Sequence, residues 1–340
     1  MLRRSEDRRD FSRAAFLGRQ PDREHGIAMG SGGRTTVPSV ASCLQPAAAL
    51  LALIPACIYC ELIPNQSKGW SSTPSASTVA ASSVVLFAAL WLFELCARRI
   101  LDRSFAEHPL LKAPQYRQIL ARHAMDTVGL AYIGYMGMSM WRELKYEEIA
   151  TTAHGRVYVY LPRFAWTCVC MLAFQVKNLL DTLTYHDGPE FIAHHVVCIL
   201  VAVGALHGQF LHLYGIFFFG ISEVSTALVS LLACFDEQHG IAELGDHFPT
   251  CKMAVGSAFA IAFIAIRAVL WPYLAYHVTI DCMAVIAEGS AHSEGIVYAF
   301  LTGLAGLTVL QFYWLAEILR RAPAELRAAM QTAKAGGKAD

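Results

Sequence analysis

The strongest constraint on this chain is a series of apolar runs, each about as long as a bilayer is thick. Eight such runs lie at 45–63, 79–98, 123–141, 157–180, 190–207, 211–234, 253–277 and 295–319. A helix needs roughly 20 predominantly apolar residues to cross the hydrocarbon of a membrane. The runs therefore predict an all-α fold, a polytopic integral membrane bundle of about seven or eight transmembrane helices. Prolines interrupt the first run, and whether residues 45–63 cross the bilayer stays open.

The composition excludes several classes of function. Hydrophobic residues make up 55% of the 340 residues and charged residues only 16%, against about 25% in ordinary globular proteins. The formal net charge is zero, so we expect no nucleic-acid partner. The ten cysteines are scattered, and Cys57 and Cys60 form a C-x-x-C that lacks a second pair. We therefore expect no metal site and no resident cofactor.

The positive charges outside the apolar runs are strongly asymmetric. With eight spans, one side of the membrane collects twenty Lys and Arg residues, in 1–44, 98–122, 235–252 and 320–340. The other side collects only Lys68, Arg142, Lys145 and Arg156. Because Lys and Arg concentrate in cytoplasmic loops, both termini are predicted to be cytosolic.

Ionisable side chains inside the apolar runs mark a candidate site. Each costs about 2.5–3.5 kcal/mol at mid-bilayer on insertion scales, so such groups normally face a polar interior or carry function. His194 and His195 lie one turn into their helix, Glu223 lies near the middle of the next, and Arg267 lies beyond the midpoint of the seventh run. Ser225 and Thr226 lie two and three residues after Glu223.

A polar stripe ends at the same side of the membrane. Gln175, Asn178 and Asp181 recur at a spacing of three, and Arg122 and Asp126 are four residues apart at the start of the third run. The predicted topology brings these groups to similar depths as the histidines. We therefore expect one buried polar pocket that opens toward the cytosol.

Structural interpretations of the same residues stay open. Adjacent histidines point about 100° apart on a helix, so one is expected to face the pocket and the other a neighbouring helix, without a preference for either. Glu223 could pair with Arg267 or a histidine and simply hold helices together. Arg163 and Lys177 are expected to extend to the membrane interface.

Four stretches in order resemble the TLC-domain family, which includes ceramide synthases and the translocating-chain-associating membrane protein. They are Asp187–His195, Phe219–Thr226, Arg267 followed by Trp271–Tyr273, and Leu310–Trp314. The motif around Glu223 is closest to the smaller TLC domain-containing proteins, because ceramide synthases carry an Asp-rich motif on this helix.

The resemblance divides the chain into four parts. Residues 1–42 are expected to form a disordered cytosolic tail, and 43–114 to hold extra transmembrane segments and a basic loop. Residues 115–320 are expected to form the TLC-type domain, and 321–340 a cytosolic C-terminal tail. The family implies membrane lipid biology, usually at the endoplasmic reticulum.

The resemblance implies a lipid-handling protein that acts in membrane lipid homeostasis, with membrane lipids, an acyl lipid or a sphingoid base as partner. Whether the chain is an enzyme stays open. The alternative is an acyl-CoA-dependent N-acyltransferase of ceramide synthase type, with acyl-CoA as co-substrate. A proton-coupled transporter is a further alternative, and the sequence is compatible with an oligomer.

Two sets of residues follow from these hypotheses. His194, His195, Glu223 and Asp181 are the candidate catalytic residues. Asn178, Ser225, Thr226, Arg267 and Trp314 are the candidate residues of the lipid or substrate pocket.

Overall fold

A computed structural model describes residues 56–57, 59–65, 68–144, 151–185, 188–236 and 240–336, without the side chains of 190 and 321–336. The described part is all-helical and contains no strand, as the apolar runs predict. The expected tail 1–42 and most of the run 45–63 lie outside the described residues. So does Asp187, at the start of the first family-like stretch.

Seven long helical segments follow one another along the described chain. They are α3 (Ala76–Ser104), α4 (Pro114–Glu143), α7 (Pro162–Tyr185), α8 (Pro189–Gly208), the continuous stretch α9–η2–α10 (His212–Gly215, Ile216–Ile221 and Glu223–Ala233), the continuous stretch α12–η3–α13 (Pro249–Phe263, Ile264–Leu270 and Trp271–Ala287) and α14 (Glu294–Gly336). Short helices connect them: η1 (Pro109–Leu111), α6 (Ala153–Tyr158) and α11 (Ala242–His247).

Local sequence explains where several helices begin and end. Pro189 occupies the first turn of α8, where its missing N–H is not needed, and Gly188 precedes it as the N-cap. The chain leaves α8 through Gln209 in the left-handed conformation, with φ 52°. At the start of α3, the side chain of Ser75 accepts a hydrogen bond from Thr78 N.

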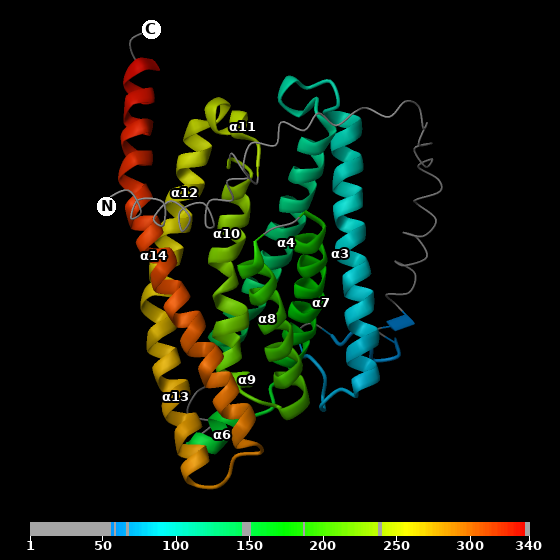
Figure 1. Ribbon diagram of the computed structural model, residues 1–340. Coiled ribbons are helices and arrows are strands. Elements are labelled where there is room, and N and C mark those ends of the chain that lie inside the picture. The colour runs from blue at the N-terminus through cyan, green and yellow to red at the C-terminus, as the bar shows by residue number, and fades with distance from the viewer. Residues whose placement is uncertain are drawn as a thin grey trace, which may run out of the picture.

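The long helices run side by side in one bundle (Figure 1). Helices α3, α4 and α7 pack against each other, and α4 also packs along η2 and α10. Helix α10 contacts α12, while α13 and η3 contact α14. Helix α8 packs mainly against α7.

Length and composition make five helical segments candidates for crossing a membrane. They are Ala76–Ser104, Phe191–Gly208, His212–Ala233, Pro249–Ala287 and Glu294–Arg320. Helices α4 and α7 are not among the five, although they have 30 and 24 residues. Both are packed inside the bundle and bury polar side chains, so they are less apolar than helices that face outward. The larger number of spans stays a prediction.

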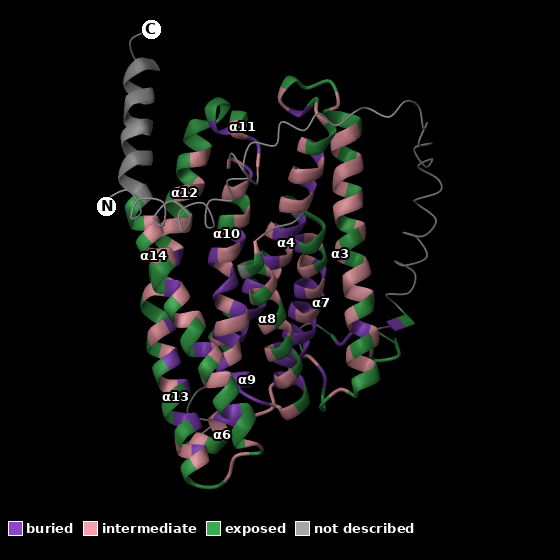
Figure 2. Ribbon diagram, viewed as in Figure 1, coloured by how far each residue is buried: buried purple, intermediate pink, exposed green. Residues whose placement is uncertain are grey.

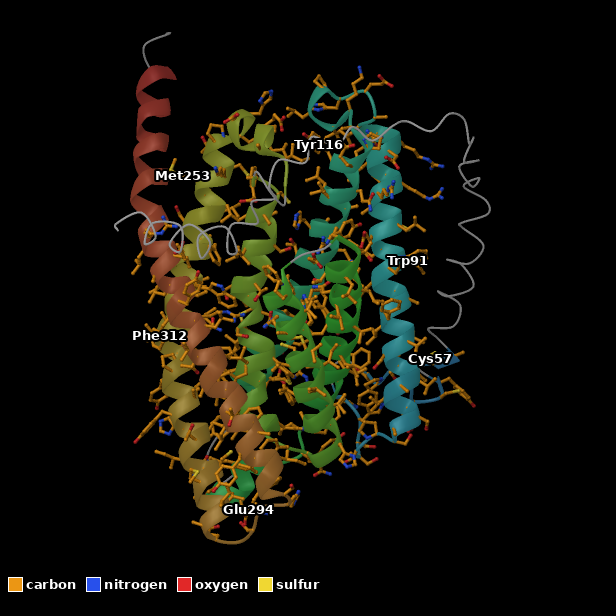
Figure 3. All side chains as sticks on the ribbon, viewed as in Figure 1. Cys57, Trp91, Tyr116, Met253, Glu294 and Phe312 are labelled. Carbon is orange, nitrogen blue, oxygen red and sulfur yellow. The ribbon has the colours of Figure 1, made fainter. Side chains whose placement is uncertain are left out.

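The outside of the bundle is largely apolar. Buried residues gather along α4 and α7, whereas α3 and α14 expose much of their surface (Figure 2). Trp91 on α3 is 55% exposed and Phe312 on α14 is 49% exposed (Figure 3). Exposed aromatic and aliphatic side chains on long helices suit contact with lipid.

Two segments depart from regular α-helix. Residues Ile216–Ile221 and Ile264–Leu270 are π-helical, each inserted in a longer helix. A π-helical turn adds a residue and rotates everything beyond it relative to a regular helix, and such turns are frequent at functional sites. Glu223 lies two residues beyond the end of the first segment, and Arg267 lies in the second.

A separate ion pair joins α6 to α13, and α6 lies at the opposite end of the bundle from α11 (Figure 1). Arg156 on α6 donates from Nε and Nη2 to the carboxylate of Asp281 on α13, each at 2.6 Å. The hydroxyl of Tyr214 donates to the same carboxylate. These bonds raise the pKa of Arg156 above its ordinary value, so the pair stays charged at physiological pH.

Candidate functional site

Arg267 is the centre of a buried polar group that joins η3, α10 and α14. Its side chain is 10% exposed, and it lies 3.6 Å from Glu223 Oε1. Its guanidinium donates to Ser225 Oγ at 2.9 Å, Thr226 Oγ1 at 2.7 Å, the carbonyl oxygen of Ser222 at 3.1 Å and Gln311 Oε1 at 3.4 Å. These six residues are called the Arg267 cluster below.

The π-helical segments help to form this cluster. Ser222 is the residue that follows the π-helical segment η2. Its carbonyl oxygen accepts hydrogen bonds from Ser225 Oγ at 2.8 Å and from Arg267. Ser225 Oγ in turn accepts from the guanidinium. A buried charge is tolerated only when it is paired and hydrogen-bonded, and this chain of donors and acceptors meets that condition.

The two histidines on α8 have different partners. His195 Nδ1 lies 2.6 Å from Gln175 Oε1 of α7, so this ring links the two helices. His194 Nε2 lies 3.7 Å from Cys198 Sγ, one turn further along α8. His194 Nδ1 is buried and has no hydrogen-bond partner among the described residues. The charge of Arg267 acts on both His194 and Cys198, which places them beside the Arg267 cluster.

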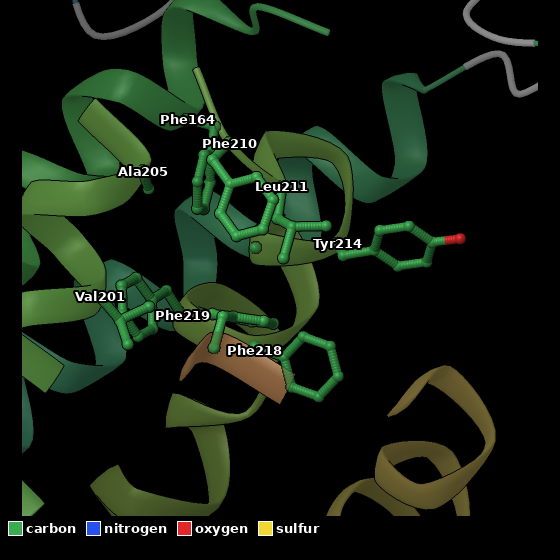
Figure 4. Close-up of a pocket in the computed structure, with 10 residues that line it drawn as sticks. Phe164, Val201, Ala205, Phe210, Leu211, Tyr214, Phe218 and Phe219 are labelled. Atoms are coloured by element: carbon green, nitrogen blue, oxygen red, sulfur yellow. The ribbon is translucent and has the colours of Figure 1, made fainter. Parts of the chain in front are cut away.

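An apolar pocket of about 30 Å³ lies between α7, α8, η2 and α14. Its lining includes Val201 and Ala205 of α8, Phe218 and Phe219 of η2, and Phe300 of α14 (Figure 4). Tyr214 lines it with its ring, while its hydroxyl is directed away to Asp281. The wall of the pocket is therefore predominantly apolar.

Polar and apolar residues follow each other along the same helix faces. On α8 the series His194, Cys198, Val201, Ala205 has spacings of four, three and four, which keep all four on one face. On α14, Phe300 and Gln311 are eleven residues apart, which returns the helix to within about 20° of the same direction. Phe218 and Phe219 precede Ser222 and Glu223 by one turn.

On α8 and α14 the polar residues lie on the same side of the apolar residues with respect to the two ends of the bundle. His194 lies about 10 Å nearer the start of α8 than Val201, and Gln311 about 16 Å beyond Phe300, at 1.5 Å per residue. Because α8 runs opposite to α14, the polar residues of both helices lie toward the same end of the bundle (Figure 1). The arrangement suits a molecule with a polar head and an apolar tail.

A second charged group lies between α3, α4 and α7. Lys177 is 2% exposed, and its Nζ lies 2.5 Å from Glu94 Oε2 and 2.5 Å from Asp181 Oδ2. Arg122 Nε lies 3.7 Å from the same oxygen of Asp181. Asp126 is 8% exposed and interacts electrostatically with Lys177 and Arg122. These five residues are called the Lys177 cluster below.

The structure divides the single polar pocket that was expected. Glu223, Ser225, Thr226 and Arg267 come together, with His194 beside them. Asp181 belongs to the Lys177 cluster because two cations hold it there. Asn178 is on the same helix as Asp181, and its Oδ1 is buried without a hydrogen-bond partner among the described residues.

Two further expectations change. Lys177 does not extend to the membrane interface, because carboxylates of α3 and α7 hold its ammonium inside the bundle. Arg163, in the first turn of α7, pairs with Glu143 at the end of α4, which is compatible with its expected place near the membrane interface. Trp314 is half-buried, one turn beyond Gln311, and is not among the residues that line the apolar pocket.

Three residues of the two clusters, and Cys198 beside His194, were not singled out from the sequence. Gln311 is a lone amide in an apolar run, and Glu94 is a lone acid in another. Cys198 lies one turn after His194, a spacing that could have identified it. Ser222 gave no signal, because its carbonyl rather than its side chain binds Arg267.

An all-helical bundle with membrane-length apolar helices and buried charges defines a multi-pass integral membrane protein. Residues 119–320 match the TRAM_LAG1_CLN8 family, described as the TLC domain. The match covers more than half of the chain, so this protein belongs to the TLC-domain family. No curated protein matches the chain.

Proposed function

We propose that this protein binds an amphipathic lipid between α8, η2–α10 and α14 and acts in membrane lipid homeostasis. The observation that carries the proposal is the continuity of polar and apolar residues along one face of each element. Membership of the TLC-domain family supports a role in lipid biology. We further propose that the protein resides in the endoplasmic reticulum with both termini cytosolic, and that α4 and α7 also cross the bilayer.

The polar end of the site would hold the lipid head. Arg267 and Glu223 provide both signs of charge, 3.6 Å apart, and His194 offers a buried ring nitrogen without a partner among the described residues. Buried polar atoms in folded proteins are nearly always satisfied by protein, water or ligand. A lipid head group with both hydrogen-bond donors and acceptors would satisfy these polar side chains.

The apolar pocket would hold part of the lipid tail. Its volume of about 30 Å³ accepts only the end of a chain, and a longer segment requires the rings of Phe219 and Phe300 to move. Helix α8 packs mainly against α7, so movement of α8 away from α14 disturbs few other contacts. We therefore expect the tail to enter between α8 and α14.

The test compares two bulky substitutions on neighbouring residues of α8. Val201→Trp fills the apolar pocket, whereas Leu200→Trp adds the same side chain at a position that is 64% exposed. Native mass spectrometry of the purified proteins measures the fraction that carries lipid. We expect at least a tenfold loss for Val201→Trp and no loss for Leu200→Trp. Equal lipid occupancy in the two variants, or none in the unsubstituted protein, would refute the proposal.

An acyl-CoA-dependent N-acyltransferase is the second candidate, favoured by the unpartnered Nδ1 of His194. A neutral imidazole can take a proton from an amine that attacks a thioester carbonyl, after which the C–S bond breaks and CoA leaves as the thiol. Release of CoA is measured with acyl-CoA and a long-chain amine. If the unsubstituted protein releases CoA no faster than His194→Ala, the second candidate is excluded.

A further inference from the structure

Cys198 is a buried thiol in direct contact with an imidazole. Cys198 is 7% exposed, and its Sγ lies 3.7 Å from His194 Nε2. This distance suits a hydrogen bond that involves sulfur. The two residues are one turn apart on α8, so the helix itself fixes their relative position.

The other buried thiols of the described chain lack this environment. Cys57, Cys168, Cys170, Cys234 and Cys282 are also buried and free. In the part of the chain that the structure describes, Cys198 is the cysteine that contacts a histidine nitrogen. A buried thiol is usually inert, and it becomes a nucleophile when a neighbouring base or cation favours the thiolate.

A base is present at Cys198, because His194 Nε2 can accept the thiol proton. The negative charge of Glu223 and the positive charge of Arg267 both act on the sulfur, so His194 is the neighbour that assists its deprotonation. When Sγ–H donates to Nε2, the neutral ring carries its other hydrogen on Nδ1. That nitrogen has no partner among the described residues, so it is left to donate to an oxygen of a ligand.

The apolar pocket begins one turn beyond the thiol along α8, at Val201. Val201 and Ala205 continue the face of α8 that carries His194 and Cys198, and both line the pocket. An acyl chain that lies in the pocket would therefore have its carboxyl end near Sγ. The chemistry that fits is an acyl group carried as a thioester.

We propose that Cys198 accepts a fatty acyl group from an acyl thioester such as acyl-CoA, with His194 moving the proton. The sulfur attacks the carbonyl carbon while Nε2 takes its proton. A new C–S bond forms at Cys198, the C–S bond to CoA breaks, and the protonated ring returns the proton to the departing thiolate. One thioester replaces another, so the step needs no oxidant or reductant. The proposal rests on the lipid site proposed above, and it adds a covalent acyl carrier to it.

The experiment measures acylation of the full-length protein in detergent, without any acceptor amine. The purified chain is incubated with an alkyne-tagged palmitoyl-CoA, and the labelled peptide and its release by hydroxylamine are determined by mass spectrometry. The variants are Cys198→Ala, Cys198→Ser and His194→Gln. The matched control is Cys282→Ala, which removes another buried thiol, at the far end of the bundle. Thermal unfolding identifies any variant that has lost its fold.

We expect one hydroxylamine-labile label on Cys198, absent from Cys198→Ala and at least tenfold weaker in His194→Gln. Cys282→Ala should label like the unsubstituted chain, and Cys198→Ser should lose the labile label while it unfolds at the same temperature. Labelling of Cys198→Ala equal to that of the unsubstituted protein would overturn the proposal, as would a label only on the exposed Cys60, Cys96 or Cys251.

If lipid co-purifies and no label forms at Cys198, the covalent step is wrong and the lipid site stands. If Val201→Trp and Leu200→Trp carry equal lipid, the lipid site itself is wrong.

Discussion

Arg267 shows how a charged side chain is accommodated within apolar helices. It is surrounded by hydroxyl, carbonyl, amide and carboxylate oxygens from α10, α14 and the residue that precedes α10. Taking a charge out of water is expensive, and attraction to a partner compensates for it only when the geometry and the remaining hydrogen bonds are good. Removing only one of the two charges, Arg267 or Glu223, should therefore destabilise the protein more than removing both.

A double-variant cycle tests this interpretation. Arg267→Met leaves Glu223 buried without its cation, and we expect a loss of about 3–5 kcal/mol in the free energy of unfolding. Arg267→Met combined with Glu223→Gln should lose less, because no buried charge is then unpaired. Chemical unfolding in detergent micelles, followed by circular dichroism, measures both values. A double variant that is less stable than Arg267→Met would show that the two side chains stabilise the bundle mainly by contacts other than their mutual attraction.

Lys177 allows a second test at the residue scale. Lys177→Met leaves Glu94 and Asp181 together in the bundle interior, and we expect a loss of about 3–5 kcal/mol. The matched control is Arg320→Met, which breaks the pair of Arg320 with Glu317 at the surface of α14. The control should unfold like the unsubstituted chain, because solvent-exposed ion pairs contribute little. The same unfolding assay compares the two, and equal effects would contradict a buried role for Lys177.

At the scale of elements, the crossing of α4 and η2 depends on two glycines. A Cβ atom built on Gly137 would lie 2.5 Å from Gly220 Cα, and one built on Gly220 would lie 2.6 Å from Gly137 Cα. Both distances are far below a normal carbon contact. Small residues allow helices to approach closely inside membranes, where packing rather than the hydrophobic effect holds them together. This contact fixes η2, and therefore Glu223 three residues later, against α4.

Gly220→Ala should force the two backbones apart. We expect a loss of about 1–3 kcal/mol, the usual effect of overpacking, together with weaker lipid retention because the Arg267 cluster shifts with η2. Gly303→Ala on α14 is the matched control, since a Cβ there meets no atom within 4 Å. It should be neutral or more stable by about 0.5–1 kcal/mol, as alanine favours helix. Unfolding and native mass spectrometry measure both effects, and a neutral Gly220→Ala would contradict the close packing.

The π-helical segments explain why helical periodicity could not locate the cluster. A regular helix advances about 100° per residue, and an inserted π turn shifts every later residue to another face. Glu223 follows one such segment and Arg267 lies within another. Their residue types marked Glu223 and Arg267 as unusual. A helical wheel drawn from either neighbouring helix, however, would place them on the wrong helix face.

At the scale of the whole molecule, the basic loops predict the orientation. The described connections α3–α4 and α11, and the end of α14, lie at one end of the bundle, and α6 lies at the other (Figure 1). The end with α11 is the one that the charge count assigns to the cytosol.

Epitope tags on the two termini test that orientation. In cells whose plasma membrane alone is permeabilised, antibodies should detect both tags, because both termini are expected in the cytosol. A luminal protein of the endoplasmic reticulum serves as the control for intact inner membranes and should stay undetected. A tag that is seen only after full permeabilisation would reverse the predicted side of that terminus.

The sequence by itself determined the class of fold and the residue types of the site. Bilayer-length apolar runs leave the chain few alternatives to membrane helices, and the residue types in those runs identify groups that must be buried with partners. His194, Glu223 and Arg267 were recognised for this reason. The family also followed from ordered local motifs, which do not depend on knowing which helices touch.

Only the tertiary structure decided which of these groups meet. Depth in the membrane follows from position along a helix, but lateral contact depends on helix packing and on register changes such as η2 and η3. This is why Lys177 and Asp181 of α7 came to join Glu94 of α3, while Gln311 of α14 came to lie beside Arg267. Contacts between helices distant in sequence are a property of the folded bundle, and no local pattern encodes them.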